Sequence, residues 1–105
     1  MEEFRKLHHD MQIQTAAVFV AVAKAPRDGM KMKELGAQTG LAQSSCSRNV
    51  ALLSETFKKG KPGLGLVKAE EDPDERRRKI VTLTAKGRRV AASLERIVED
   101  IEKRG

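Results

Sequence analysis

The stretch from Asp72 to Thr84 reads DPDERRRKIVTLT and predicts a β-hairpin that runs directly into a helix. Asp-Pro turn chemistry stands at the tip, and residues 76–79 place four consecutive cations there. Leu66 to Glu70 and Lys79 to Leu83 alternate like strands and supply the two arms. Thr84 precedes a long helical pattern and is its expected N-cap.

Upstream of the hairpin, the spacing predicts two helices joined by a very short turn. The first covers about Lys33 to Thr39, and Gly40 can end it in a left-handed C-terminal cap. Two residues later a second helix begins and is expected over about Gln43 to Phe57. This spacing is typical of a helix–turn–helix, with the two helices crossing steeply.

The second of these helices has a core stripe and a polar face. The stripe recurs at i, i+4, i+7 and i+11 and consists of Cys46, Val50, Leu53 and Phe57. The polar face carries Ser44, Ser45, Ser47 and Arg48, which are short hydrogen-bond donors and one long fork suited to guanine or phosphate. An ordinary solvated face is the alternative, although Glu and Lys are commoner there because serine competes with the helix backbone.

Helices are also expected at both ends, at about 10–24 with Asp10 as N-cap and at about 84–103. The first has two apolar faces, one for the core and one for a partner: Ile13, Ala17 and Val20, and Ala16, Phe19 and Ala23. It breaks at Ala25–Gly29, and a short extended piece follows at Met30–Met32. The last helix carries the stripe Val90, Leu94, Ile97, Val98 and Ile101. That stripe packs either on its own domain or on a second copy, and we expect a homodimer.

Composition bounds the function. At 105 residues the chain has room for one domain, with the helix–turn–helix at about 33–57 and the hairpin at about 66–83. A net charge of +6 and a pI near 9.8 favour a polyanionic partner, although a basic surface that binds nothing is the alternative. The absence of Trp and Tyr disfavours a single-stranded nucleic-acid platform, which stacks bases on aromatic rings.

The compartment can be anticipated as well. One cysteine allows no internal disulfide and is compatible with a reducing cytosol. No signal peptide is visible, and the longest apolar run, Ala16 to Ala23, is too short to span a bilayer. We therefore expect a cytoplasmic protein of bacterial, archaeal, phage or plasmid origin, with no membrane partner.

Two stretches resemble the MarR-type winged helix–turn–helix regulators. Residues 32–50 contain the Gly-Leu turn followed by a Ser-rich helix with an Arg. Residues 72–78, followed by Leu-Thr-Ala-Lys-Gly at 83–87, are similar to the wing of that family, which commonly ends in Asp-x-Arg before Leu-Thr-x-x-Gly. Together the two motifs cover about half the chain in the family's order.

The resemblance implies a mainly α fold with a small β-hairpin (α+β), a C-terminal dimerisation helix and binding to duplex DNA. Arg77 falls where the family's wing arginine sits, and Glu75 replaces the aspartate that would orient that arginine. The chain is shorter than typical members, and residues 58–65 look like an insertion, which either touches the DNA backbone or is a solvated connector. Family members often bind small aromatic ligands, but the short arms and scarce aromatic residues disfavour such an effector here.

Other chemistry has little support in the sequence. Cys46 lies on the apolar stripe, which favours a buried core thiol over a redox switch. His8, His9 and Asp10 are adjacent and point apart on a helix, so a metal site is not expected. No nucleophile–base pair is present, and we expect neither an enzyme nor a cofactor.

The sequence therefore predicts a sequence-specific double-stranded DNA-binding transcriptional regulator, a homodimeric repressor. A plasmid or phage replication or partition module and a winged-helix protein–protein adaptor remain as alternatives. The expected DNA-binding residues are Gln43, Ser44, Ser45, Ser47, Arg48, Lys58, Lys59, Lys61, Arg76, Arg77, Arg78 and Lys79. The expected dimer-interface residues are Phe19, Val90, Leu94, Ile97, Val98 and Ile101.

Overall fold

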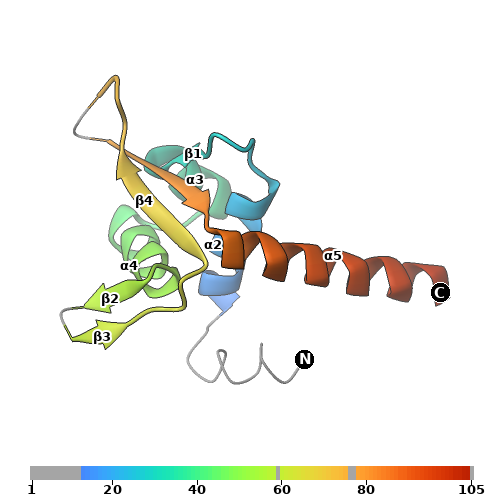
Figure 1. Cartoon of the computed structure of the whole chain (residues 1–105). Helices are drawn as coiled ribbons and strands as arrows, with labels where there is room; N and C mark the ends of the chain where they lie inside the picture. The colour runs from blue at the N-terminus through green and yellow to red at the C-terminus, as the bar shows by residue number, and fades with distance from the viewer. Residues whose placement is uncertain (1–12, 59, 76–77, 105) are drawn as a thin grey trace.

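A computed structural model describes residues 13–58, 60–75 and 78–104 (Figure 1). The predicted Asp10 N-cap and the His8-His9-Asp10 group lie outside these residues. The elements in chain order are α2 (Ile13–Lys24), β1 (Met30–Lys31), α3 (Met32–Thr39), α4 (Gln43–Leu53), β2 (Thr56–Lys58), β3 (Lys61–Pro62), β4 (Val67–Glu71), β5 (Lys79–Leu83) and α5 (Ala85–Arg104). The expected α+β winged-helix architecture is confirmed.

The turn between α3 and α4 has the predicted cap. Gly40 takes a left-handed conformation (φ 74°) that only glycine adopts without strain, and its N–H donates to the Gly36 carbonyl at 2.9 Å. Ala42 is extended, and its carbonyl accepts the first bond of α4 from the N–H of Cys46. The chain therefore leaves α3 and enters α4 within two residues of the cap.

The predicted end of α4 is wrong, because the helix stops at Leu53 and not at Phe57. Ser54 is extended (ψ 174°), and its hydroxyl donates to the Val50 carbonyl at 2.7 Å. The N–H groups of Leu64 and Leu66 bind the carbonyls of Leu52 and Leu53, which lack helical partners at this end. The helix therefore ends where residues 64–66, further along the chain, bind its last carbonyls.

The expected loop at residues 58–65 is also wrong, since its first half belongs to an antiparallel hairpin. β2 pairs with β3 through Thr56 opposite Pro62 and Lys58 opposite Lys61. Phe57 therefore lies on a strand and is half-buried, outside the core stripe in which it was expected. A Cβ at Gly63 would overlap the Ser54 carbonyl oxygen and lie 2.8 Å from that of Leu52, so only glycine allows this close approach.

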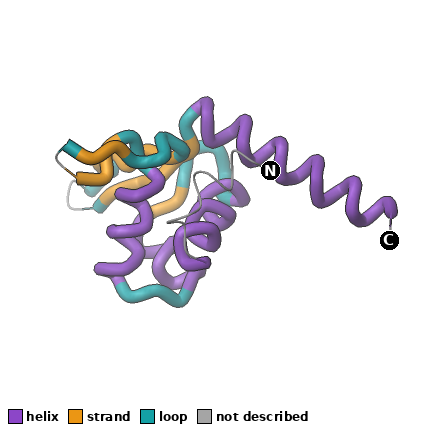
Figure 2. The backbone as a smooth tube through the Cα atoms, turned by 90° about the horizontal axis from the view of Figure 1, so that it is seen from below, coloured by secondary structure: helices purple, strands orange, loops and turns teal. Residues whose placement is uncertain are grey.

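The wing forms the predicted sheet, with one strand added. The antiparallel order is β1-β5-β4, with Ala69 opposite Val81 on one side and Met30 opposite Val81 on the other. Alternation along the strands turns Val67 and Val81 inward, and both are buried. In Figure 2 the helices of the body lie against one side of these strands.

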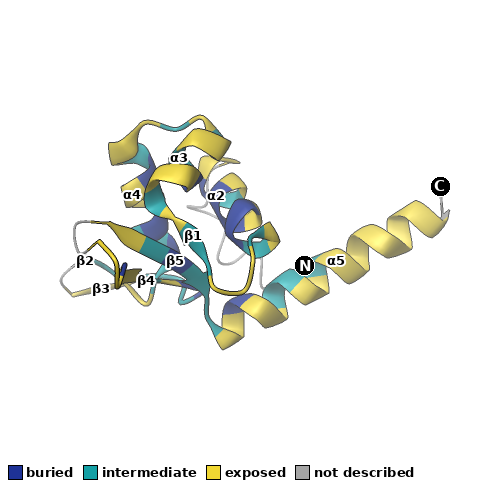
Figure 3. Cartoon of the chain, turned by 90° about the horizontal axis from the view of Figure 1, so that it is seen from above, coloured by how far each residue is buried: buried dark blue, intermediate teal, exposed yellow. Residues whose placement is uncertain are grey.

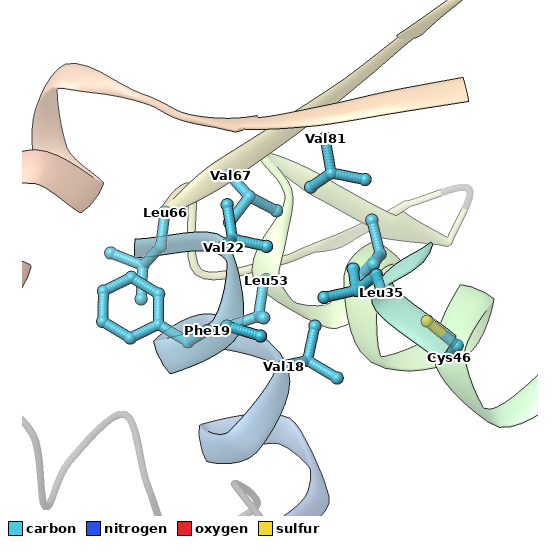
Figure 4. Close-up of a cluster of buried hydrophobic side chains, with 11 residues drawn as sticks. Val18, Phe19, Val22, Leu35, Cys46, Leu53, Leu66, Val67 and Val81 are labelled. Carbon is cyan, nitrogen blue, oxygen red and sulfur yellow. The ribbon is translucent and has the colours of Figure 1, made fainter. Parts of the chain in front are cut away.

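The core joins the helices to the sheet (Figure 4). Its buried apolar side chains are Val18, Phe19, Ala21, Val22, Leu35, Cys46, Val50, Leu53, Leu66, Val67 and Val81. Phe19, expected at the dimer interface, is only 2% exposed in this core, so that assignment is corrected. The other expected face of α2 is exposed along Ile13, Ala17 and Val20.

Thr84 caps α5 as predicted. Its hydroxyl accepts the Gly87 N–H at 3.0 Å and donates to the Gly65 carbonyl at 2.6 Å, so the cap also ties the start of α5 to the segment that precedes β4. Val90, Ala91 and Leu94 pack partly on the core, and the second half of the helix is exposed (Figure 3). No helix in the described part of the chain is both long and apolar enough to cross a membrane.

Candidate nucleic-acid interface

The polar face of α4 is presented as the sequence predicts. Gln43, Ser44, Ser47 and Arg48 are exposed, while Ser45 is half-buried. On the opposite face Cys46, Val50 and Leu53 are held in the core. The first two turns of the helix therefore expose one amide, two hydroxyls and one guanidinium to solvent, on Gln43, Ser44, Ser47 and Arg48.

A buried polar pair on the inner side of α4 is not among the residues expected from the sequence. The Thr15 hydroxyl of α2 donates to Asn49 Oδ1, and Asn49 Nδ2 donates to the Ser45 carbonyl at 2.8 Å. Both side chains are buried. The signal was present in the sequence, since Asn49 stands three residues after Cys46 and four before Leu53, on the same helical face as the core stripe.

Arg48 contacts the β2–β3 hairpin. Its guanidinium carbon lies 6.0 Å from the centroid of the Phe57 ring, which is within the range of a cation–π attraction. From the sequence, Arg48 and Phe57 are expected on opposite faces of one helix. The early end of α4 brings them together instead, because Phe57 is on the strand that turns back beside the helix.

The turn of the wing is organised by its acidic residues. Asp72 is buried, and its Oδ1 accepts the N–H of Asp74 at 2.9 Å, an Asx-turn. The Asp72 N–H donates to the Arg78 carbonyl, which closes the hairpin. The Glu75 carboxylate pairs with Arg78 Nε at 2.7 Å, while its expected role in orienting Arg77 stays a prediction. Arg76 and Arg77 lie outside the described residues.

The remaining predicted cations lie on the two hairpins. Lys79 is exposed at the start of β5, and Lys61 is exposed on β3 opposite Lys58. Lys59 lies outside the described residues. In Figure 1 both hairpins extend to the side of the body away from the C-terminal end of α5, and α4 is on that side as well. The structure thus places α4, with its exposed polar residues, and the two hairpins on one side of the body.

Cys46 is placed for packing. Its side chain is 1% exposed, and its Sγ lies 3.9 Å from the sulfur of Met32. Burial raises the pKa of the Cys46 thiol, which keeps it protonated at neutral pH and makes it a poor nucleophile. Among the described residues, no group of three or more His, Cys, Asp and Glu side chains could hold a metal ion.

The exposed apolar residues lie elsewhere. On α5 the exposed fractions rise along the helix, from 37% at Ile97 to 52% at Val98 and 63% at Ile101. On α2, Ile13 is 88% exposed. These side chains leave two apolar helix faces without cover from the described part of the chain.

A shallow hollow of about 250 Å³ lies between the end of α2, the turn at residues 25–29, β5 and the start of α5. The buried Thr82 hydroxyl oxygen at this hollow has no hydrogen-bond partner among the described residues. The volume falls below the range of roughly 300–1,000 Å³ that is usual for small-molecule pockets. The hollow by itself therefore gives little support to an effector site.

The sequence matches no protein-family model and no curated protein. Solved structures do match. The crystal structure of MarR aligns with a TM-score of 0.69 and 24% identity over 94% of this chain and 66% of that one. The S. aureus MepR–DNA complex aligns with a TM-score of 0.77 and 15% identity over 96% of this chain and 73% of that one. PcaV from Streptomyces coelicolor, in complex with its natural ligand, aligns with a TM-score of 0.68 and 23% identity, over 95% and 64% of the two chains.

The chain therefore has the winged-helix fold of the MarR-type transcriptional regulators. It spans about two thirds of the length of the MarR and PcaV chains. At identities of 15–24% the likeness establishes the fold.

Proposed function

We propose that this chain is a sequence-specific double-stranded DNA-binding transcriptional regulator that acts as a homodimeric repressor, without enzymatic activity. The observation that carries the proposal is the position of α4, with its exposed polar residues, on the same side of the body as the two hairpins, on which Lys61 and Lys79 are exposed. The similar MepR was captured as a complex with DNA, which supports the same use of the fold.

The geometry suits a duplex. A helix with its side chains is about 10–12 Å across, and the B-DNA major groove is about 12 Å wide, so α4 fits with its polar face toward the base edges. The hydroxyls of Ser44 and Ser47 can each donate or accept a hydrogen bond, so they would contact either acceptor or donor atoms on base edges. Arg48 would bind guanine O6 and N7 or a phosphate. The wing, with residues 76–79, would reach an adjacent minor groove or its phosphates.

The dimer is inferred from the uncovered apolar faces. Ile97 and Ile101 on α5, with Val98 beside them, continue the seam that begins at Val90 and Leu94. We expect a second copy that covers this seam to contact the exposed face of α2 as well. Two-fold symmetry then implies a pseudo-palindromic operator, with half-sites about 10 bp or a multiple apart. A regulator of this kind would work in the cytoplasm, where it meets its DNA.

A salt titration tests the DNA-binding proposal. Each neutralised phosphate releases condensed counterions and contributes about −0.9 to the slope of log K against log salt. If each subunit contacts roughly three to five phosphates, the slope for a dimer is about −5 to −9. Fluorescence anisotropy with duplexes selected in vitro from a random pool would measure both the slope and the sequence preference.

The same titration separates the rival functions. A flat salt dependence, or no duplex binding at low salt, would favour the protein–protein adaptor. A replication or partition module would bind DNA equally well, and genomic footprinting would then locate its sites at a replication origin. Sites at promoters support the regulator.

A further inference from the structure

The contact between Arg48 and Phe57 links the exposed face of α4 to the β2–β3 hairpin. Arg48 is exposed, Phe57 is half-buried, and the guanidinium carbon lies 6.0 Å from the ring centroid. Among the described residues Arg48 forms no ion pair with a carboxylate, since the ion pairs there join Lys68 to Glu70 and Arg78 to Glu75. In the described part of the chain the guanidinium therefore has a cation–π approach to the Phe57 ring, at the outer limit of the usual range, and no ion pair.

The ring is itself held in place relative to α4. Backbone N–H groups of the returning chain bind four consecutive carbonyls at the end of the helix: Gly63 to Glu55, Leu64 to Leu52, Gly65 to Ser54 and Leu66 to Leu53, at 2.7–3.0 Å. The close approach at Gly63 leaves no room for a side chain. The hairpin that carries Phe57 is therefore anchored to the same helix that carries Arg48.

An arginine that is oriented before binding loses less rotamer freedom when it meets its target. A guanidinium is planar and reads guanine through two parallel N–H donors, so its orientation decides whether both bonds form. A phosphate contact is more tolerant of orientation, because phosphate oxygens accept from many directions. Orientation of Arg48 should consequently affect base discrimination more than overall affinity.

We propose that Phe57 is a positioning residue for Arg48, and that the β2–β3 hairpin sets base preference through this ring. The inference rests on the proposed DNA-binding function. It assigns to Phe57 a role in specificity although the ring itself reads no base.

The test uses the full chain and a duplex obtained by in vitro selection, together with a panel of single-base variants of that duplex. Phe57→Leu keeps an apolar side chain and removes the aromatic face, whereas Phe57→Tyr keeps the face. We expect Phe57→Leu to lower discrimination by about two- to fivefold at the base positions that Arg48→Ala also affects, the size of an exposed cation–π contact. Phe57→Tyr should retain the discrimination of the unmutated chain.

Two further variants isolate the role. In an Arg48→Ala background Phe57→Leu should cause no further loss, because the residue it positions is gone. Lys61→Ala, on the neighbouring strand, should weaken binding to every duplex alike and reduce the salt slope by about one per subunit, leaving base preference unchanged. Thermal unfolding of each variant would show whether the fold is retained.

The outcomes are distinct. If the unmutated chain binds no duplex, the proposed function fails and the inference fails with it. If the unmutated chain discriminates between duplexes and Phe57→Leu discriminates equally well, the positioning role is wrong while the DNA-binding function stands. The positioning role is also overturned if Phe57→Leu and Phe57→Tyr lose base discrimination equally. It is overturned as well if Phe57→Leu lowers base discrimination as much in the Arg48→Ala background as in the unmutated chain. In either case the ring would not act through its aromatic face on Arg48.

Discussion

The hydrogen bond between Thr15 and Asn49 should make the stabilities of α2 and α4 interdependent. Thr15→Val replaces the hydroxyl with a methyl group of similar size and leaves the buried Asn49 Oδ1 without its donor, at a cost of about 1–3 kcal/mol. Asn49→Ala also removes the bond to the Ser45 carbonyl and opens a small cavity, so about 2–4 kcal/mol is expected. Once Asn49 is gone, Thr15→Val removes an unpaired hydroxyl and should cost little.

The double variant should therefore be about as unstable as Asn49→Ala alone, with a coupling energy as large as the cost of Thr15→Val, about 1–3 kcal/mol. Urea or thermal unfolding at one fixed protein concentration measures this, because any self-association would make stability concentration-dependent. Each kcal/mol corresponds to about 4–8 °C in Tm for a domain of this size. Ser47→Ala, on the exposed face of α4, is the control and should change stability by about 0.5 kcal/mol or less. Additive effects of the two substitutions would refute the buried bond.

Three other predictions follow from surfaces and burial. Ile97→Glu should yield monomers in sedimentation at micromolar concentration and abolish cooperative binding to a duplex with two half-sites. The control Ala92→Glu, on the opposite face of α5, should sediment like the unmutated protein. If the unmutated protein is itself a monomer, the dimeric model is contradicted. Arg77→Ala should weaken duplex binding by about 1–3 kcal/mol in fluorescence anisotropy without loss of fold, and unchanged affinity even when Arg76 and Arg78 are also Ala would contradict docking through the wing. Cys46 should react with a thiol reagent far more slowly than a peptide cysteine, and reaction at the peptide rate would contradict its burial. Burial raises the pKa of the Cys46 thiol in the folded state, so the thiol contributes stability that is fully present at pH values below the ordinary pKa of a cysteine. That stability is lost as the pH rises through the pKa of the folded state. Cys46→Ala should reduce this loss, which unfolding measurements across that pH range would show.

The elements with strong local signals could be predicted from the sequence. Gly40 and Thr84 mark helix ends by their own backbone and side-chain chemistry, and the alternation at Lys79–Leu83 depends only on neighbouring residues. These signals fix the helix–turn–helix and the wing. The polar face of α4 followed from the same local pattern.

The errors came from interactions between distant residues. The end of α4 depends on N–H groups ten or more residues further along the chain, and the helical period continues to Phe57 without them. Strands of two and three residues, as in the β2–β3 hairpin, leave almost no periodicity to detect. Phe19 was assigned to a partner because α2 is apolar on two faces, and only the packed sheet shows which face is covered. The contact between Arg48 and Phe57 depends on the early end of α4 and on the β2–β3 hairpin, so it could not have been inferred from neighbouring residues.

The second half of α5 has a thermodynamic consequence. Leu94 is the last residue of this helix that packs on the core, and the ten residues from Glu95 to Arg104 extend about 15 Å beyond it. A helical segment of that length is marginal in water without tertiary contacts, since propagation barely offsets the cost of ordering the backbone. Coverage by a second copy would supply the missing contacts, so association and helix formation at this end would be one coupled step. Helical content measured by circular dichroism would then fall as the protein is diluted, and the strength of assembly would include the free energy of folding this segment.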